Sequence, residues 1–233
     1  MSRDFLTLEE LVQRVGRDRR LLEKQLQRGV IPGRRINGEW RFNEQEITQW
    51  LEQDLRNLDP SQLEQLELSQ KSEEISSQTP LQALLKLETC EIPLDAGTRP
   101  AALQALVELA GRTWQVWSPS EILTAVRDRE NAMSTAFENG VAIPHPRNPL
   151  PDALGESIIA FGRTLSPIPF GGPGRSKTDL FFLVLARDSR THLQILARLG
   201  RLISNQNLLD QLRSCESGAE AWSLLTETDR QLG

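Results

Sequence analysis

The stretch NGVAIPHPR, residues 139–147, is the most informative part of this 233-residue chain. Its apolar residues Val141 to Ile143 predict a short strand, and Pro144 and Pro146 end the strand because neither has an N–H to donate. Each proline also keeps the residue before it out of the α region, so His145 is expected on stiff, extended backbone. An imidazole held in this way suits a nucleophile that must meet a phosphorus atom in line.

The residues around this strand supply candidate ligands for a phosphoryl group. A helix is predicted from Ser118, which acts as N-cap before a proline and a capping-box glutamate, to the pair Arg129-Glu130. The candidates for binding phosphoryl oxygens are Arg129, Ser134, Thr135, Gly140 and Arg147. Simpler alternatives exist, since Arg129 can face a helix C-terminal dipole and the two hydroxyls can serve only to turn the loop.

The other histidine of the chain, His192, lies in DLFFLVLARDSRTHLQILARLGRLI, residues 179–203. Leu180 to Ala186 has the length and composition of a buried strand. Thr191 to Gln194 is a capping-box pattern, which predicts that His192 is the first residue of the next helix. Helix starts at the carboxyl end of a strand bind anionic ligands in open α/β sheets. The alternative is a core histidine, because Ile195 and Leu199 continue its helical face.

These two stretches resemble the type-2 enzyme IIA family of the sugar phosphotransferase system, the fructose, mannitol and nitrogen-regulatory units. The family pattern corresponds here to Arg129-Glu130, Ser134-Thr135, Asn139-Gly140 and Ala142 to His145. The opening TPLQALLKLETCEIPLDAGTRPAALQALVELA also looks like the family's first strand and helix, so the resemblance covers residues 79–225. In one departure, Ala136-Phe137 follows Ser-Thr where the family usually has glycine, and this is expected to reshape the loop near the acceptor.

The resemblance implies a fold, an activity and roles for three residues. The fold is α/β, a mixed β-sheet with helices on both faces, placed over residues 79–233. The resemblance implies that His145 is the phosphorylated histidine, with Arg129 as active-site arginine and His192 as the second histidine. The histidine-containing phosphocarrier protein is the expected donor, and a separate enzyme IIB is a possible recipient. No cofactor is expected, and no metal either, because the sequence shows no third ligand at suitable spacing for two histidines.

Residues 1–56 predict a small winged helix-turn-helix domain that precedes the α/β domain. A first helix is stopped by Gly16, a second runs from Asp18 to about Arg28, and a third runs from Asn43 to about Glu52. Between them, Asn37-Gly38 is a strong hairpin signal, flanked by RRI and EWRF. This order of elements resembles the excisionase and MerR-type winged helix-turn-helix domains.

A local excess of positive charge points to DNA as the partner of this domain. The whole chain has a net charge of −5, whereas Arg17 to Arg41 has eight basic against three acidic residues, a net +5. A recognition helix and a basic wing of this kind can neutralise phosphates. The predicted DNA-binding residues are Arg17, Arg19, Arg20, Lys24, Arg34 and Arg35. The alternatives are a solvated charged face or a domain that binds protein.

Residues 57–78 contain acids, Gln and Ser with leucines at the start, and predict a helical tail followed by a flexible linker. Two cysteines without CxxC spacing indicate a reducing compartment. No apolar signal core is present and no apolar stretch nears roughly 18 residues, so a cytoplasmic protein without a membrane partner is expected.

The leading interpretation is a phosphorylation-linked regulator whose N-terminal domain binds DNA or a regulatory target, because a phosphoryl group adds nearly two negative charges. One alternative is a regulator whose enzyme IIA domain does not carry phosphate. Another is a metabolic phosphocarrier whose N-terminal domain only docks a partner.

Overall fold

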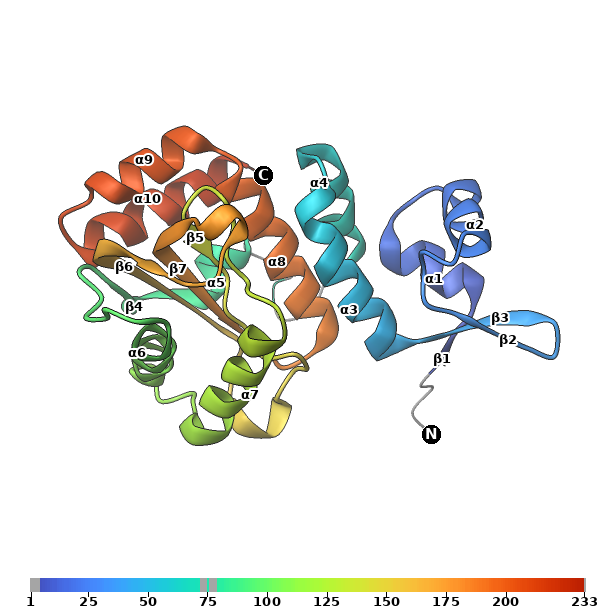
Figure 1. The fold of residues 1–233 in the computed structure, drawn as a ribbon, viewed down its shortest axis with the longest axis horizontal. Helices are drawn as coiled ribbons and strands as arrows, with labels where there is room; N and C mark the ends of the chain where they lie inside the picture. Colours follow the sequence, from blue (N-terminus) through green and yellow to red (C-terminus); the bar gives the residue numbers. More distant parts are fainter. Residues whose placement is uncertain (1–4, 72–74, 76–78, 233) are drawn as a thin grey trace.

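The computed structural model describes residues 5–71, residue 75 and residues 79–232. Figure 1 shows an α/β lobe that carries the main sheet and, beside it, a smaller helix-turn-helix lobe. Helices α3 (Glu44–Asp54) and α4 (Pro60–Ser69) run between these two lobes. Among the described residues, none of the helices combines the length and the apolar character needed to span a bilayer.

The α/β lobe is built on a four-stranded mixed sheet with the order β4-β6-β7-β5. Its strands are β4 (Leu85–Glu91), β5 (Val141–Ala142), β6 (Ile158–Pro169) and β7 (Lys177–Leu185). Strand β6 is antiparallel to β7, whereas β4 pairs with β6 and β5 with β7 in parallel. Short 3₁₀ turns, η3 (Pro151–Ala153) and η4 (Pro173–Arg175), lie before and after β6, and η4 belongs to the Gly-rich connection to β7.

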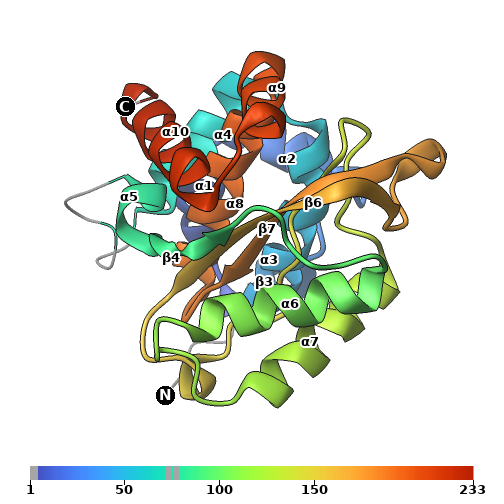
Figure 2. The same cartoon turned by 90° about the vertical axis from the view of Figure 1, so that its left-hand side faces the viewer.

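Helices cover both faces of this sheet, as predicted (Figure 2). They are α5 (Pro80–Leu84), α6 (Arg99–Gly111), α7 (Pro119–Ala132), α8 (Ser189–Ile203), α9 (Gln206–Ser214) and α10 (Gly218–Gln231). Helices α6 and α7 share one apolar core with the sheet, around Phe170 and Phe181. Helices α5, α8, α9 and α10 share the core on the other face, around Phe161 and Phe182. The alternation of side chains along β6 and β7 sends residues to both cores.

The smaller lobe has the predicted winged helix-turn-helix order. It contains β1 (Phe5–Leu6), α1 (Leu8–Val15), α2 (Arg19–Gln27), β2 (Arg34–Ile36) and β3 (Glu39–Asn43), followed by α3. The wing turns at Asn37 and Gly38, whose φ angles of 53° and 83° are those of a type I′ hairpin. The two-residue strand β1 pairs with β3 and makes a three-stranded sheet, which the sequence did not predict.

Two predicted helix starts need correction. Ser118 takes the N-cap position of α7, but its side chain makes no capping hydrogen bond. Helix α8 begins at Ser189 with Asp188 as N-cap, so the prediction of His192 as first helical residue was wrong. The carboxylate of Asp188 accepts from the N–H groups of Arg190 and Thr191 directly after the strand, so the helix forms one turn earlier.

The first half of the predicted linker is packed against the α/β lobe. Leu55–Asn57 forms the 3₁₀ turn η1, and α4 follows it and lies along α8. Gly200 of α8 allows a close approach, since a Cβ there would lie 3.2 Å from Leu63. Helix α4 is therefore the predicted helical tail, and it packs against the α/β lobe. Residues 72–74 and 76–78 of the predicted linker lie outside the described residues.

Gly140→Ala is expected to destabilise the protein by more than about 1 kcal/mol, because Gly140 has a φ of +85°. Its carbonyl accepts from the N–H groups of Asp179 and Leu180, and a Cβ would lie 3.0 Å from the Asp179 carboxylate. Urea unfolding measures the effect. Gly111→Ala is the control, because Gly111 ends helix α6 with open space around it, and it is expected to stabilise by about 0.5 kcal/mol. Equal effects of the two substitutions would contradict this account.

Candidate active site

The sheet topology brings the two histidines together. Strands β5 and β7 are parallel neighbours, so their carboxyl ends meet at one edge of the sheet. His145 follows β5, and His192 lies in the first turn of α8, which follows β7. The ring centroids are 5.1 Å apart with the rings in an edge-to-face arrangement. The segment before His145 is tied to the sheet, because the N–H of Val184 donates to the Pro144 carbonyl.

The His145 ring is buried and its tautomer is set by the backbone. Nδ1 lies 2.7 Å from the carbonyl oxygen of Ile143. A carbonyl only accepts, so Nδ1 carries the proton and Nε2 carries the lone pair in the neutral ring. Among the described residues, Nε2 has no hydrogen-bond partner. Burial lowers the pKa of His145 below its ordinary value, and the nearby Glu52 carboxylate only partly opposes this effect. The arrangement favours a neutral ring with a nucleophilic Nε2.

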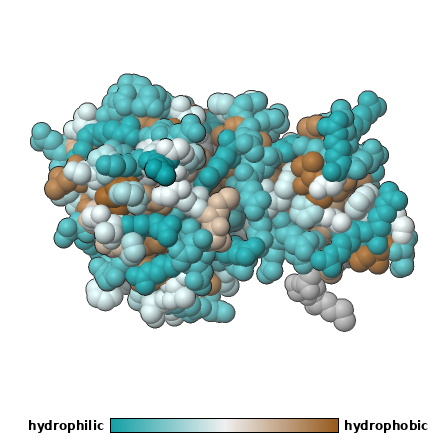
Figure 3. Space-filling model, viewed as in Figure 1, coloured by the Kyte–Doolittle hydropathy of each residue, from teal (hydrophilic) through white to brown (hydrophobic). Residues whose placement is uncertain are grey.

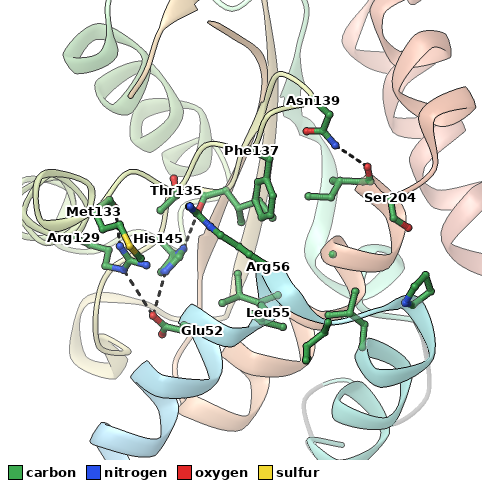
Figure 4. Close-up of a pocket in the computed structure, with 17 residues that line it drawn as sticks. Glu52, Leu55, Arg56, Arg129, Met133, Thr135, Phe137, Asn139, His145 and Ser204 are labelled. Atoms are coloured by element: carbon green, nitrogen blue, oxygen red, sulfur yellow. Dashed lines mark hydrogen bonds and ion pairs between the residues drawn. The ribbon is translucent and has the colours of Figure 1, made fainter. Parts of the chain in front are cut away.

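An acid from α3, the helix between the two lobes, completes the site. Glu52, near the end of α3, places Oε1 2.8 Å from Nε2 of His192. Its Oε2 lies 3.5 Å from Nε2 of His145, and Figure 4 shows this carboxylate pointing toward His145 and Arg129. Its side chain is 3% exposed. Burial alone would raise the pKa of Glu52, but the interactions with both histidines outweigh burial and hold it well below its usual range. Glu52 is therefore an ionised carboxylate between the two rings.

Helix α7 supplies an arginine and the acid that folds the next loop. The Arg129 side chain is 9% exposed, and its Nε lies 3.7 Å from Oε2 of Glu52. Its Nη1 donates to the Met133 carbonyl. Glu130 accepts hydrogen bonds from the N–H and the hydroxyl of Thr135, the latter at 2.6 Å. This pairing fixes the loop between α7 and β5 so that Arg129 faces the histidines.

The structure brings together His145, His192 and Arg129, but it places most of the other predicted phosphoryl ligands elsewhere. Thr135 lines the cavity beside His145, with its hydroxyl donating to Glu130. Ser134 donates to the carbonyl of Phe170. Gly140 lies against Asp179. Arg147 is exposed and donates to Gln49 of α3. These contacts serve the loop and the packing between the lobes.

A cavity of about 190 Å³ adjoins the site and is closed on one side by the segment after α3. Phe137, Ile143 and Leu196 line it from the α/β lobe, and Leu55, Arg56 and Leu63 from the other side. Arg56 donates to the Ser134 carbonyl and lies 5.2 Å from the centre of the Phe137 ring. Figure 4 shows Arg56 reaching across the cavity.

Glu52, His145 and His192 are the described residues whose ligand atoms cluster closely enough to hold a metal ion, all within 4.8 Å of one another. Two imidazoles and a carboxylate form a set that zinc accepts. The sequence analysis found no third ligand at suitable spacing and so missed Glu52, because α3 brings it from a distant part of the chain. Arg129 lies against the same carboxylate, and a fixed positive charge there favours an anion over a cation.

The predicted DNA-binding residues all lie on the helix-turn-helix lobe, in two different settings. The guanidinium of Arg17 is largely buried, pairs with Asp54 at 2.6 Å and lies over the Trp50 ring. It therefore ties α3 to the lobe. The other predicted residues, Arg19, Arg20, Lys24, Arg34 and Arg35, are exposed. On this lobe, at the right in Figure 3, hydrophilic atoms surround small hydrophobic patches.

Comparison with known proteins identifies both parts of the chain. The model of the family described as "Phosphoenolpyruvate-dependent sugar phosphotransferase system, EIIA 2" matches residues 83–228. The chain belongs to this family. A model described as a helix-turn-helix domain matches residues 5–54. The resemblance inferred from the sequence is thus confirmed for the enzyme IIA type-2 domain and for the helix-turn-helix domain.

Relatives with curated descriptions match the enzyme IIA part. The chain is 27% identical over 151 residues to the nitrogen regulatory protein of Escherichia coli, covering 64% of this chain and 91% of the relative. It is 31% identical over 156 residues to the fructose-specific EIIA component of Haloferax volcanii, covering 66% and 96%.

Solved structures show that the fold is shared. Nitrogen regulatory protein IIA-Ntr of Neisseria meningitidis gives a TM-score of 0.55 at 24% identity, covering 60% of this chain and 95% of the other. IIA mannitol of Escherichia coli gives a TM-score of 0.53 at 22% identity, covering 60% of this chain and 98% of the other. A complex of IIA mannitol with phosphorylated IIB mannitol, also from Escherichia coli, gives a TM-score of 0.52 at 21% identity, covering 60% of this chain and 96% of the matched chain.

The imidazole of His145 is expected to titrate below about pH 6.5, the ordinary value for histidine, because burial disfavours its charged form. The folded protein then binds fewer protons than the unfolded chain near pH 6. This contribution to stability is complete above about pH 6.5 and is lost as the pH falls through the folded pKa. NMR titration of the ring protons measures it, and His192→Gln assigns the two signals. A midpoint at or above 6.5 would contradict the expectation.

Proposed function

We propose that this protein accepts a phosphoryl group on Nε2 of His145 from the histidine-containing phosphocarrier protein of the phosphotransferase system, and that its helix-turn-helix domain binds DNA. The observation that carries the first part is the His145 ring itself. It is held between two prolines, and its Nδ1–H is engaged by the Ile143 carbonyl. Its Nε2 lies 3.5 Å from Oε2 of Glu52, the carboxylate that also meets His192 and Arg129.

The transfer needs only groups that the site contains and a phosphohistidine on the donor. The lone pair of Nε2 attacks the phosphorus, the N–P bond of the donor breaks, and its electron pair returns to the donor imidazole. Arg129 and the N–H of His192 supply positive charge and a hydrogen-bond donor for the phosphoryl oxygens as charge builds up. No water is consumed, and the proton stays on Nδ1, which donates a hydrogen bond to the Ile143 carbonyl.

Relatives support this reading of partners. Enzyme IIA mannitol, which has this fold, has been solved in complex with phosphorylated enzyme IIB mannitol. By analogy, a separate enzyme IIB or a regulatory target is the proposed recipient. We place these steps in the cytoplasm, which agrees with Cys90 and Cys215 being free thiols.

The DNA part of the proposal rests on the helix-turn-helix match and on the exposed basic side chains. Helix α2 presents Arg20 and Lys24 to solvent, and the wing presents Arg34 and Arg35. A helix and a wing with these charges can contact phosphates on both sides of a groove.

One observation favours a second candidate function, a regulator whose enzyme IIA domain carries no phosphate. Glu52 already occupies the face of Nε2 where a phosphoryl group would be attached, at 3.5 Å. If this contact never opens, the domain serves only as a platform for the helix-turn-helix lobe.

His145→Gln is expected to abolish phosphorylation. The purified protein is incubated with phosphoenolpyruvate, enzyme I and the phosphocarrier protein, and intact mass is measured before and after acid treatment. The unaltered chain is expected to gain one acid-labile phosphoryl group. His192→Gln is the matched control, since it leaves His145 as the only histidine, and it is expected to gain the group more slowly. No gain by the unaltered chain with partners from the same organism would favour the second candidate.

Arg20→Ala combined with Lys24→Ala is expected to weaken DNA binding at every sequence and to reduce the slope of log affinity against log salt by about 2, one for each lost phosphate contact. Fluorescence anisotropy with duplex DNA at several salt concentrations measures it. Lys177→Ala, an exposed charge of the α/β lobe, is the control and should leave the slope unchanged. DNA binding that is absent, or unaffected by the double substitution, would point to a protein partner.

A further inference from the structure

The acceptor site is covered by the same segment that ends the helix-turn-helix domain. We call the segment formed by α3, η1 and α4, residues 44–69, the cover. His145 is 5% exposed, and its Nε2 faces Glu52 of the cover. A donor protein has to bring its phosphohistidine to this nitrogen. In the arrangement of Figure 4 the cover stands in the way, so the site as described cannot receive a phosphoryl group.

The Glu52 carboxylate takes the contacts that a phosphoryl group would need. Oε1 accepts from His192 at 2.8 Å, and Oε2 lies 3.5 Å from His145 and 3.7 Å from Arg129. The 3.5 Å separation is near van der Waals contact, which leaves no room for phosphorus and its oxygens between the two atoms. A carboxylate and a phosphoryl group are both anionic hydrogen-bond acceptors, so both fit this set of partners but only one can be present.

Electrostatic repulsion also opposes the presence of the Glu52 carboxylate and a phosphoryl group in the same site. In the unphosphorylated protein, the Glu52 carboxylate lies beside Arg129 and His192, and its interactions with both are attractive. After phosphorylation, the phosphoryl oxygens on His145 carry about two negative charges in a buried region of low dielectric constant. The phosphoryl group then repels Glu52 and competes with it for the same donors. Phosphorylation and docking of the cover therefore oppose each other.

The cover is continuous with both lobes, so its movement is transmitted. Leu193 and Ala197 on the outer side of α8 belong to the same apolar core as Leu11, Phe42 and Leu51 of the helix-turn-helix lobe. Arg14 of α1 lies 3.0 Å from Glu44 of α3 and donates to Ser189 at the start of α8. The helix-turn-helix lobe thus rests on α8 through the cover, and the loss of the Glu52 contact weakens this interface at its buried end.

We propose that Glu52 is a built-in substitute for the phosphoryl group, which keeps the unphosphorylated protein closed, and that phosphorylation of His145 expels Glu52 and releases the cover and the helix-turn-helix lobe from α8. The opening step rests on the proposed function, but the closing role of Glu52 does not. In the unphosphorylated protein, the acceptor site is therefore occupied by the protein's own Glu52 side chain.

The first experiment tests closure without any phosphoryl donor. Amide hydrogen exchange is measured on the full chain, comparing the unaltered protein with Glu52→Gln, which keeps the shape of the side chain and removes its charge. Faster exchange is expected in the cover and along α8. Glu46→Gln, on the same helix but paired with Arg34 at the surface, is the matched control and should show no change at α8. Arg56→Ala, which removes a contact of the cover away from the histidines, should also loosen the cover.

The second experiment measures the rate of phosphorylation by the phosphocarrier protein. An open form that makes up about 1–10% of the molecules would limit the rate, so Glu52→Gln is expected to accelerate it roughly 10- to 100-fold. Exchange in the cover should rise on phosphorylation of the unaltered protein and stay constant in His145→Gln. If no variant is phosphorylated, the proposed function fails, while the first experiment still decides whether Glu52 closes the site.

Three outcomes would overturn the inference. Unchanged exchange in Glu52→Gln would show that the carboxylate does not hold the cover. Slower phosphorylation of Glu52→Gln would make Glu52 a positioning residue that serves the transfer. Loosening by EDTA that is reversed by zinc would show that Glu52, His145 and His192 close around a metal ion.

Discussion

The parallel pairing of β5 with β7 is the constraint on which the rest of this molecule depends. It is short, with Val141 opposite Leu180 and Ala142 opposite Phe181. It sets His145 beside the strand that leads into α8, and therefore beside His192. Gly140 begins the pairing, because its carbonyl accepts from the N–H groups of both Asp179 and Leu180 on β7.

Helix α8 carries the consequences of this pairing to the other lobe. Eleven of its 15 residues are buried, because one side packs on the sheet and the opposite side packs on α3, α4 and the helix-turn-helix core. Buried charges on α8 form ion pairs with the neighbouring helix: Arg198 and Arg201 both pair with Glu67 of α4. A helix buried on both sides couples the two lobes, since neither can shift without exposing apolar surface or unpairing charge.

The candidate active site is built from residues of both parts of the chain. Arg129 and His192 of the α/β lobe contact the carboxylate of Glu52, which α3 supplies. Glu52 comes from α3, so the N-terminal part of this chain contributes to the chemistry of the site as well as to the architecture. The same contact explains why both a carrier and a regulator are consistent with one set of residues.

The sequence by itself determined the local elements and singled out His145 and His192 as the candidate site histidines. Capping residues, the Asn37-Gly38 turn and the prolines around His145 act over a few residues, so their effects are readable without a fold. The start of α8 was misjudged because Asp188 and Thr191 are both good caps, and only the end of β7 chooses between them. The tertiary structure alone decided that Glu52 meets His145 and His192 across 93 and 140 residues (145 − 52 and 192 − 52). Such contacts depend on how two lobes pack, and no periodicity or spacing along the chain records that packing.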